Sequence, residues 1–233
     1  MDFRIRYIHQ QELRSDYRKD RNASRARNKG IRISKGKYIA TLDDDDFWCD
    51  QRKLEKQVQF LENHPDYVVC GGGVVVIREE NPEKPFLRPY YPEKDEDIRK
   101  RMLFGDAHVH SSLVFRKEVW ETIGGYDEKL PFGDDWNFYL RLGKVGKLYN
   151  FPEYFTYFLL GQQNKTDRVE YKRESLGVSI RFIKKYRNDY PGFPKAILLA
   201  WACYFYSFLP FGESLRPVFV KIKHRIFDPF LYK

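Results

Sequence analysis

Few cysteines, no signal-peptide pattern and no internal repeat are the first features of this 233-residue sequence. Its three cysteines lie far apart, with neither CxxC nor histidine-rich spacing, which argues against a disulfide scaffold and a zinc ribbon. The opening MDFRIRYIHQ lacks the run of ~7–15 apolar residues that follows the basic segment of a signal peptide. No collagen-like or coiled-coil bias is present either. We therefore expect a protein of a reducing, cytoplasmic compartment.

Apolar and aromatic residues, in contrast, are plentiful. Hydrophobic residues make up 42% of the chain and aromatic residues 17%, which is too much apolar surface for a disordered protein. At about 100–200 residues per domain, the length allows one large domain or two small ones. The composition therefore predicts a folded globular protein with a substantial core.

The positive charge is concentrated near the beginning of the chain. The formal net charge is +9, and residues 1–37 contain 12 Lys and Arg against 4 Asp and Glu. Such a distribution favours an anionic partner, for example a nucleotide phosphate, a nucleic acid or an acidic lipid. The remainder of the chain is close to balanced.

The order of apolar patterns and turn residues predicts an α/β protein. Residues 37–42, KYIATL, read as a buried strand whose carboxyl end meets four consecutive aspartates, and ligands favour that end of an α/β sheet. Three glycines inside the strand predicted for 66–77 indicate a bulge or a close backbone approach. An exposed loop is expected over 81–98, where prolines recur. Further strands are expected over 110–115 and 147–160, and helices over 24–34, 51–64, 117–123, 134–146 and 167–189.

The four aspartates, residues 43–46, suggest a metal site. Unpaired, they would repel one another, and hard cations such as Mg²⁺ or Mn²⁺ prefer carboxylate oxygens. In an extended segment alternate residues point the same way, so Asp43 and Asp45 could share a ligand while Asp44 faces elsewhere. The competing interpretation is a solvated acidic loop or a helix-capping run.

Two segments of the sequence combine basic, apolar and acidic motifs. They are RARNKGIRISKGKYIATLDDDDFW and, about 90 residues later, SSLVFRKEVWETIGGYDEKLPFGDDWNFYLRL. Together they resemble the family 2 glycosyltransferases of the GT-A fold. The family pattern runs from an ARNxG helix through a strand to a DxD-type motif, and an acidic pair later opens a helix. The joint occurrence is more specific than DDDD alone. The resemblance implies a mixed, Rossmann-like sheet flanked by helices, and transfer of a sugar from a nucleoside diphosphate to a saccharide or lipid-linked acceptor.

The resemblance also implies roles for individual residues. Asp43 and Asp45 would hold Mn²⁺ or Mg²⁺ on the donor diphosphate, and Arg27, Asn28, Asp43 and Asp44 would line the nucleotide-sugar site. Asp135, with Asp134 beside it, would act as the general base on the acceptor hydroxyl in an inverting reaction. The competing interpretations are a solvated helix face for Arg27 and ordinary helix capping for the later acidic pair.

The resemblance is incomplete at the start of the chain. The family normally begins with a β-α-β unit that carries base and ribose contacts, and this sequence starts after it. We therefore divide the chain into a partial GT-A catalytic domain, residues 1–160, and a helical C-terminal extension, residues 161–233. Two alternatives stay open: an inert transferase relative acting as a membrane-apposed interaction module, and a basic nucleic-acid-binding protein. The second ranks lower because the acidic run lies beside the basic segment, so no nucleic-acid partner is expected.

The C-terminal extension carries an uncharged run over residues 196–212. Its 17 residues are at the lower limit for spanning a bilayer, and Pro210 would shorten any helix. Aromatic residues within the run and basic residues around it favour peripheral seating on an anionic inner membrane face. A helical pair packed against the catalytic domain is the alternative.

Overall fold

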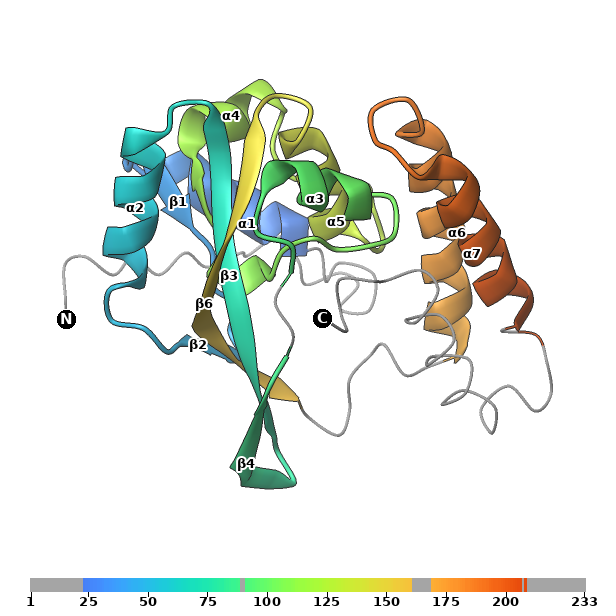
Figure 1. Cartoon of the computed structure of the whole chain (residues 1–233), viewed down its shortest axis with the longest axis horizontal. Helices are drawn as coiled ribbons and strands as arrows, with labels where there is room; N and C mark the ends of the chain where they lie inside the picture. Colours follow the sequence, from blue (N-terminus) through green and yellow to red (C-terminus); the bar gives the residue numbers. More distant parts are fainter. Residues whose placement is uncertain (1–22, 89–90, 161–168, 207, 209–233) are drawn as a thin grey trace, which may run out of the picture.

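A six-stranded mixed sheet forms the centre of the computed structural model, which describes residues 23–88, 91–160, 169–206 and 208 (Figure 1). Five strands follow the order β1-β5-β3-β6-β2, and β4 pairs with β3. All pairs are antiparallel except β3 with β6. The strands are β1 (Tyr38–Ala40), β2 (Asp46–Trp48), β3 (Tyr67–Arg78), β4 (Asn81–Leu87), β5 (Val114–Arg116) and β6 (Lys147–Leu160). The predicted α/β class is confirmed.

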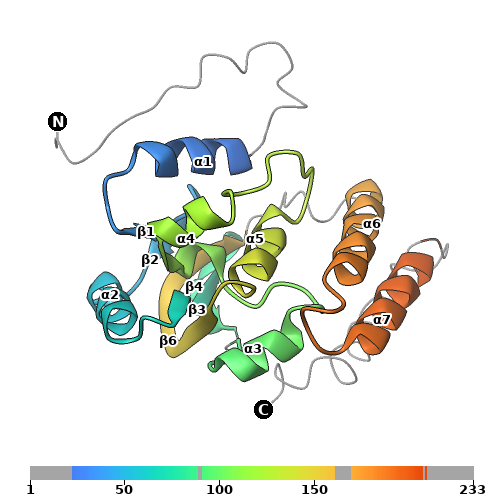
Figure 2. The same cartoon turned by 90° about the horizontal axis from the view of Figure 1, so that it is seen from above.

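Helices cover both faces of the sheet. Figure 2 shows α1, α4 and α5 stacked on one side of the strands, with α6 and α7 side by side beyond α5. The α-helices are α1 (Ala23–Ile33), α2 (Lys53–Asn63), α3 (Asp95–Arg101), α4 (Lys117–Thr122), α5 (Asp134–Leu142), α6 (Val169–Lys185) and α7 (Phe193–Tyr206). A short 3₁₀ turn, η2 (His110–Ser112), precedes β5.

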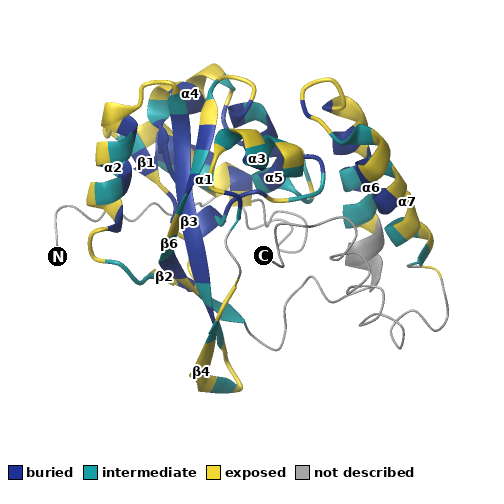
Figure 3. Ribbon diagram, viewed as in Figure 1, coloured by how far each residue is buried: buried dark blue, intermediate teal, exposed yellow. Residues whose placement is uncertain are grey.

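Strand alternation distributes the core between the two faces. Val69 and Phe115 belong to the larger hydrophobic cluster, whereas their chain neighbours Cys70 and Val114 pack on the other side with Leu61 of α2. Successive side chains of a strand point to opposite faces, so one pair of strands supports both cores. The dark centre of β3 in Figure 3 reflects this burial from both sides.

The glycines of β3 mark a close backbone approach, as predicted. A Cβ at Gly72 would overlap the Phe155 ring and approach the Glu153 carbonyl, and the β3–β6 register shifts between Gly71 and Gly73. The strand nevertheless continues through the glycines instead of being interrupted by them. Only a residue without a side chain allows the two long strands to lie this close.

The prediction of an exposed loop over residues 81–98 is wrong. Its first part forms β4, which pairs with β3 as a hairpin, and its last part begins α3. The prolines are tolerated because β4 pairs with β3 alone among the described strands, and an edge strand can lack ladder donors. The exposure that the prolines indicated is present, since most of β4 is accessible to solvent (Figure 3).

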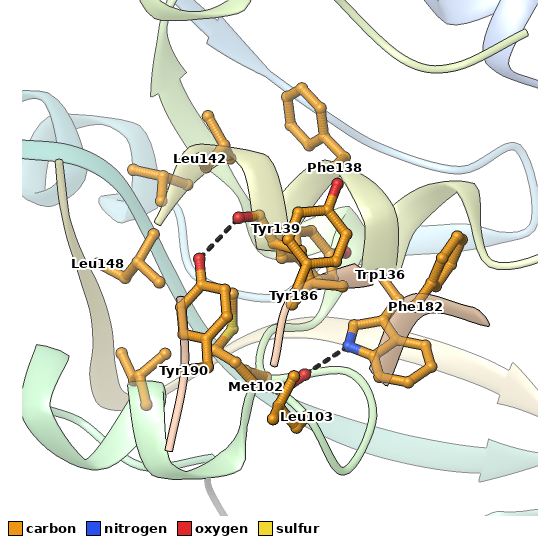
Figure 4. Packing of buried hydrophobic residues seen from close by; sticks show 14 of the residues in the cluster. Met102, Leu103, Trp136, Phe138, Tyr139, Leu142, Leu148, Phe182, Tyr186 and Tyr190 are labelled. Carbon is orange, nitrogen blue, oxygen red and sulfur yellow. Dashed lines mark hydrogen bonds between the residues drawn. The ribbon is translucent and has the colours of Figure 1, made fainter. Parts of the chain in front are cut away.

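The described helices of the C-terminal extension share one core with the helices that precede them. The Phe182 ring of α6 meets Trp136 of α5 edge-on at 5.5 Å, and the Tyr190 hydroxyl donates to the Leu140 carbonyl at 2.6 Å (Figure 4). Trp136 Nε1 also donates to the Met102 carbonyl at 2.7 Å. The alternative to membrane seating was a helical pair packed against the catalytic domain, and such packing is present between α6 and α5. Within the described part of the chain, no helix combines the length and apolarity that a membrane span needs.

Candidate active site

One guanidinium joins acids from two distant segments. Arg27 of α1 contacts Asp134 Oδ2 and Asp135 Oδ1 through Nη1, at 2.8 and 2.7 Å, and Asp43 Oδ1 through Nη2 at 2.9 Å. The Arg27 side chain is 19% exposed, so water screens these ion pairs only in part. The structure thus brings together four of the site residues that the sequence predicted.

The acidic pair occupies the first turn of α5. Gly133 precedes it with φ of 70°, a left-handed backbone that glycine adopts without strain, and Phe182 leaves little room for a side chain there. The N-terminal end of a helix carries partial positive charge, which suits two carboxylates. Ser24 of α1 donates a further hydrogen bond to Asp134 Oδ2 at 3.0 Å. The pair is therefore fixed by α1 as well as by its own helix.

The four aspartates form a turn, so the argument from an extended segment is wrong. The Asp46 N–H donates to the Asp43 carbonyl at 3.2 Å, which closes the turn before β2 begins. Asp43 lies against Arg27, whereas Asp44 and Asp45 are exposed. The assignment of Asp43 and Asp45 as metal ligands is thus still a prediction, but alternation along a strand no longer supports it.

Asp46 is the buried member of the acidic turn. Ser111 Oγ donates a short hydrogen bond to Asp46 Oδ2, while Asp46 Oδ1 is buried and accepts no hydrogen bond. Burial raises the pKa of this carboxyl, although the Ser111 hydrogen bond opposes the change. An orphaned carboxylate oxygen next to exposed carboxylates is a donor set that suits one hard cation. The described residues contain no group of three or more acidic, histidine or cysteine side chains that could hold a metal ion.

His110 is a site residue that the sequence analysis left out. Its side chain is buried, its Nδ1 lies 3.4 Å from Asp43 Oδ1, and its Nε2 lies 3.5 Å from Asp135 Oδ1. The same Nε2 is 3.0 Å from the Tyr126 hydroxyl. His110 thus lies between Asp43 of the acidic turn and Asp135 of α5. Its position in the segment 110–115, which the sequence predicted to be a strand, was the available clue.

Opposing electrostatic effects set the pKa values of Asp43 and Asp135. Burial alone would raise the pKa of Asp43, but His110 and Arg27 outweigh it and hold that pKa well below its usual range. For Asp135 the balance is reversed, because burial raises its pKa despite the nearby His110 and Arg27. The negative charge of Asp134 adds to this increase. Asp43 is therefore stabilised as an anion, while Asp135 binds a proton more readily than an ordinary aspartate.

Asn28 connects helix α1 to the loop before α5. Its amide nitrogen donates to the Tyr126 carbonyl and to Glu128, both at 2.8 Å, and its oxygen accepts from the Tyr126 N–H at 2.8 Å. The oxygen also accepts from Trp120 Nε1 at 3.2 Å. The residue is only 2% exposed, so its hydrogen-bonding capacity is used inside the protein. Asn28 thereby fixes the position from which Arg27 reaches the acids.

A mixed sheet flanked by helices is the GT-A arrangement that the resemblance implied, and in this chain an acidic turn and an acidic helix start meet at one arginine. The family model for glycosyl transferase family 2 matches residues 1–123, and the chain belongs to that family. The resemblance found in the sequence is therefore confirmed.

Similar proteins agree with this placement. The chain is 29% identical over 208 residues to an uncharacterized glycosyltransferase, MJ1057, of Methanocaldococcus jannaschii, covering 86% of this chain and 69% of that protein. It is 28% identical over 128 residues to the amylovoran biosynthesis glycosyltransferase AmsE of Erwinia amylovora, covering 55% of this chain and 46% of AmsE. Among solved structures, S. aureus TarS 1-349 in complex with UDP-GlcNAc matches with a TM-score of 0.54 at 12% identity, covering 87% of this chain and 57% of that chain. The chain thus spans about half of AmsE and of TarS 1-349.

Proposed function

We propose that the protein transfers a glycosyl group from a nucleoside-diphosphate sugar to an acceptor hydroxyl, with inversion at the anomeric carbon. The observation that carries the proposal is the contact of Arg27 with Asp43 on one side and with Asp134 and Asp135 on the other. Donor-side and acceptor-side acids are thereby within reach of one reacting centre. The UDP-GlcNAc in the TarS neighbour supports this class of donor.

Asp135 is the proposed general base. Its carboxylate would accept the proton of the acceptor hydroxyl while that oxygen bonds to the anomeric carbon and the bond to the diphosphate breaks. A raised pKa makes the carboxylate a stronger base, and burial supplies that increase. Asp134 supports the base by sharing Arg27 with it.

Asp43 and Asp45 are the proposed ligands of Mn²⁺ or Mg²⁺. Asp43 uses Oδ1 for Arg27, and its Oδ2 accepts no hydrogen bond from the described side chains. Such a cation would supply Lewis-acid stabilisation of the departing diphosphate. In this arrangement Arg27 and Asp44 line the donor site, and Asn28 acts indirectly by holding α1 in place.

Removal of metal should abolish nucleotide binding. Titration calorimetry with UDP or GDP should show binding that disappears in EDTA and returns with Mn²⁺. Asp45→Ala should weaken the affinity by about 10-fold or more, because a lost carboxylate ligand lowers the charge that holds the cation. Asp97→Ala, a surface carboxylate of α3, is the matched control and should bind normally. Nucleotide binding that is indifferent to EDTA would contradict the metal assignment.

We also propose a role in the synthesis of cell-surface polysaccharide or glycoconjugate at the inner membrane face. The similarity to AmsE, named for amylovoran biosynthesis, supports the polysaccharide role. On α7, Leu198, Trp201 and Phe205 are 65%, 37% and 64% exposed, and Lys184 of α6 lies 5.9 Å from the Trp201 ring. Exposed aromatic and aliphatic side chains beside a cation suit the headgroup region of an anionic membrane.

Flotation with anionic liposomes tests the membrane proposal. The full chain should float with vesicles of acidic phospholipid, and high salt should weaken the binding because exposed charges are screened. Phe205→Glu should reduce the bound fraction by about tenfold, since a charged residue would replace an inserted ring. Leu87→Glu, at an exposed apolar residue of the β4 hairpin, should float like the wild type. Equal loss in both variants, or no flotation of the wild type, would count against peripheral seating.

The two alternatives predict different results. An inert interaction module would bind membranes without binding nucleotide, so the calorimetric titration separates it from a transferase. A nucleic-acid binder would rely on the basic side chains near the start of the chain, of which residues 1–22 lie outside the described residues, while Arg27 is engaged by three carboxylates. The family membership favours sugar transfer over both.

A further inference from the structure

The short turn η2 holds the acidic segment on both sides of the four aspartates. Before them, Thr41 Oγ1 donates to the His110 carbonyl at 2.5 Å, and after them Trp48 Nε1 donates to the Ser111 carbonyl at 2.8 Å. Thr41 and Ser111 are 8% and 1% exposed, so these contacts are shielded from water. The aspartates are thus attached to a buried turn that lies 63 to 69 residues further along the chain.

The Ser111 hydroxyl lies at the centre of these contacts. Its oxygen accepts a hydrogen bond from the Asp43 N–H at 3.1 Å and donates the short hydrogen bond to Asp46 Oδ2. A serine hydroxyl can donate one hydrogen bond while it accepts another, and here both capacities serve the same acidic turn. One side chain therefore fixes the first and the last of the four aspartates.

Serine holds these carboxylates without cancelling their charge. Mutual repulsion of four adjacent aspartates opposes a tight turn, so the turn needs a partner that offsets this cost. A lysine or arginine at position 111 could bind Asp46 as well, but its positive charge would reduce the attraction of the turn for a cation. Among the described ion pairs, Arg27 contacts only Asp43 of the four aspartates. The neutral hydroxyl orders the turn and leaves most of its negative charge available.

We propose that Ser111 is a positioning residue of the donor site, which holds the acidic turn in the conformation that binds a divalent cation and the donor diphosphate. It acts through Asp43 and Asp46. The inference rests on the proposed metal-dependent donor binding for the role of the turn. Its structural basis is the pair of hydrogen bonds that one buried hydroxyl makes to that turn.

The next residue in the chain provides a matched control. Ser112 is fully buried, and its hydroxyl accepts from the Gly72 N–H at 3.0 Å and donates to the Val109 carbonyl at 2.7 Å. The two serines therefore have the same size, similar burial and similar hydrogen bonding. They differ in the segment that each holds, because Ser111 faces the acidic turn and Ser112 faces β3.

Nucleotide titration of the two alanine variants tests the proposal. In the presence of Mn²⁺, Ser111→Ala should weaken the affinity for UDP or GDP by about fivefold or more, because the turn loses two hydrogen bonds. Ser112→Ala should keep the wild-type affinity within about twofold, although thermal unfolding should show a similar fall in Tm for both variants. Equal losses of affinity in both variants, or none in Ser111→Ala, would overturn the proposal.

Trp48→Phe tests the same turn with a milder change. The substitution removes the Nε1 donor to the Ser111 carbonyl but keeps an aromatic ring beside Lys53. It should weaken nucleotide affinity by about two- to threefold, less than Ser111→Ala, because one hydrogen bond to η2 is lost and both bonds of the hydroxyl remain. A larger loss in Trp48→Phe than in Ser111→Ala would contradict the central place of the hydroxyl.

Hydrogen exchange measures the turn without any ligand. Exchange of the Asp43 amide should become about tenfold faster in Ser111→Ala, whereas in Ser112→Ala the faster amide should be that of Gly72. Unchanged exchange at Asp43 in Ser111→Ala would overturn the proposal even if the wild type binds no nucleotide, a result that would by itself reject the proposed donor binding. Metal-dependent binding that is equal in the wild type and Ser111→Ala would reject the role of Ser111 alone.

Discussion

Asp135→Asn is expected to lower kcat by about 1,000-fold while the affinity for the donor changes little. The asparagine keeps the shape of the side chain but cannot accept the proton of the acceptor hydroxyl. Because the lost group acts in the transition state, the defect should appear in kcat and not in donor binding. Steady-state kinetics and a parallel nucleotide titration measure the two effects.

The pH profile adds an independent check on Asp135. Burial raises the pKa of Asp135, so activity should fall as the pH drops through that raised pKa and the base becomes protonated. The residual activity of Asp135→Asn should lack this acidic limb. Asp127→Asn, in the loop before α5, serves as the control and should retain both the rate and the profile. A wild-type rate in Asp135→Asn would remove the base from the mechanism.

Arg27→Ala is expected to damage both stability and function. Three carboxylates would lose their shared cation in a partly buried site, which should cost about 3 kcal/mol of folding free energy. For a chain of this size that corresponds to a fall in Tm of about 6–12 °C. Transfer activity should be lost as well, because donor-side and acceptor-side acids would no longer be held together. Thermal unfolding by circular dichroism and the transfer assay measure the two losses.

Arg27→Lys and Arg25→Ala are the control variants for Arg27→Ala. Arg27→Lys keeps the charge but not the planar fork that contacts three acids, so it should recover part of the stability and little of the activity. Arg25→Ala removes a side chain that is 49% exposed, and its Tm should stay within about 2 °C of the wild type. A normal Tm in Arg27→Ala would contradict the role assigned to this guanidinium.

The difference in folding stability between the wild type and Arg27→Ala should also depend on pH. In the folded protein the pKa of Asp43 is held well below its usual range, so this group stabilises the fold above its unfolded pKa of about 4. That contribution is lost as the pH falls through the lowered pKa of the folded state. In Arg27→Ala the part of this stabilisation that Arg27 supplies is absent at every pH, whereas the larger part that His110 supplies remains. The gap between wild type and variant should therefore be widest near neutrality and should narrow below about pH 4.

Local sequence patterns predicted where helices and strands lie better than they predicted which residues of those elements are buried. The helix expected over residues 51–64 is present as α2, but the helical spacing of Leu54, Val58 and Leu61 matches its buried face only in part. Leu61 is buried, whereas Leu54 is 40% exposed, and the polar residues Lys53 and Gln57 are buried. Lys53 Nζ lies 4.3 Å from the Trp48 ring, and burial lowers its pKa to about 8. A periodicity argument assigns such polar residues to solvent, because it contains no information about a ring contributed by another segment.

The candidate site shows the same difference between residues that local motifs predict and residues that only contacts between distant segments reveal. Asp43 and the acidic pair of α5 were predicted from motifs, and the structure brings them to one arginine. His110 was not among the predicted site residues, because His108 and His110 without a carboxylate motif beside them are weak sequence evidence of a metal site. Its carboxylate neighbours come from segments 67 and 25 residues away along the printed chain, so only the folded arrangement reveals them.

The bridge made by Arg27 limits how this protein can change over evolution. Both halves of the site are tied to one side chain, and that side chain is positioned by an asparagine whose amide is fully engaged. A substitution of Arg27 is therefore expected to act on the proposed donor side and the proposed acceptor side at once. The α6 helix, in contrast, packs against the helix that carries the acidic pair, where the Phe182 ring meets Trp136. We therefore expect changes in α6 to act on the acidic pair of α5 while the contact between Arg27 and Asp43 stays unchanged.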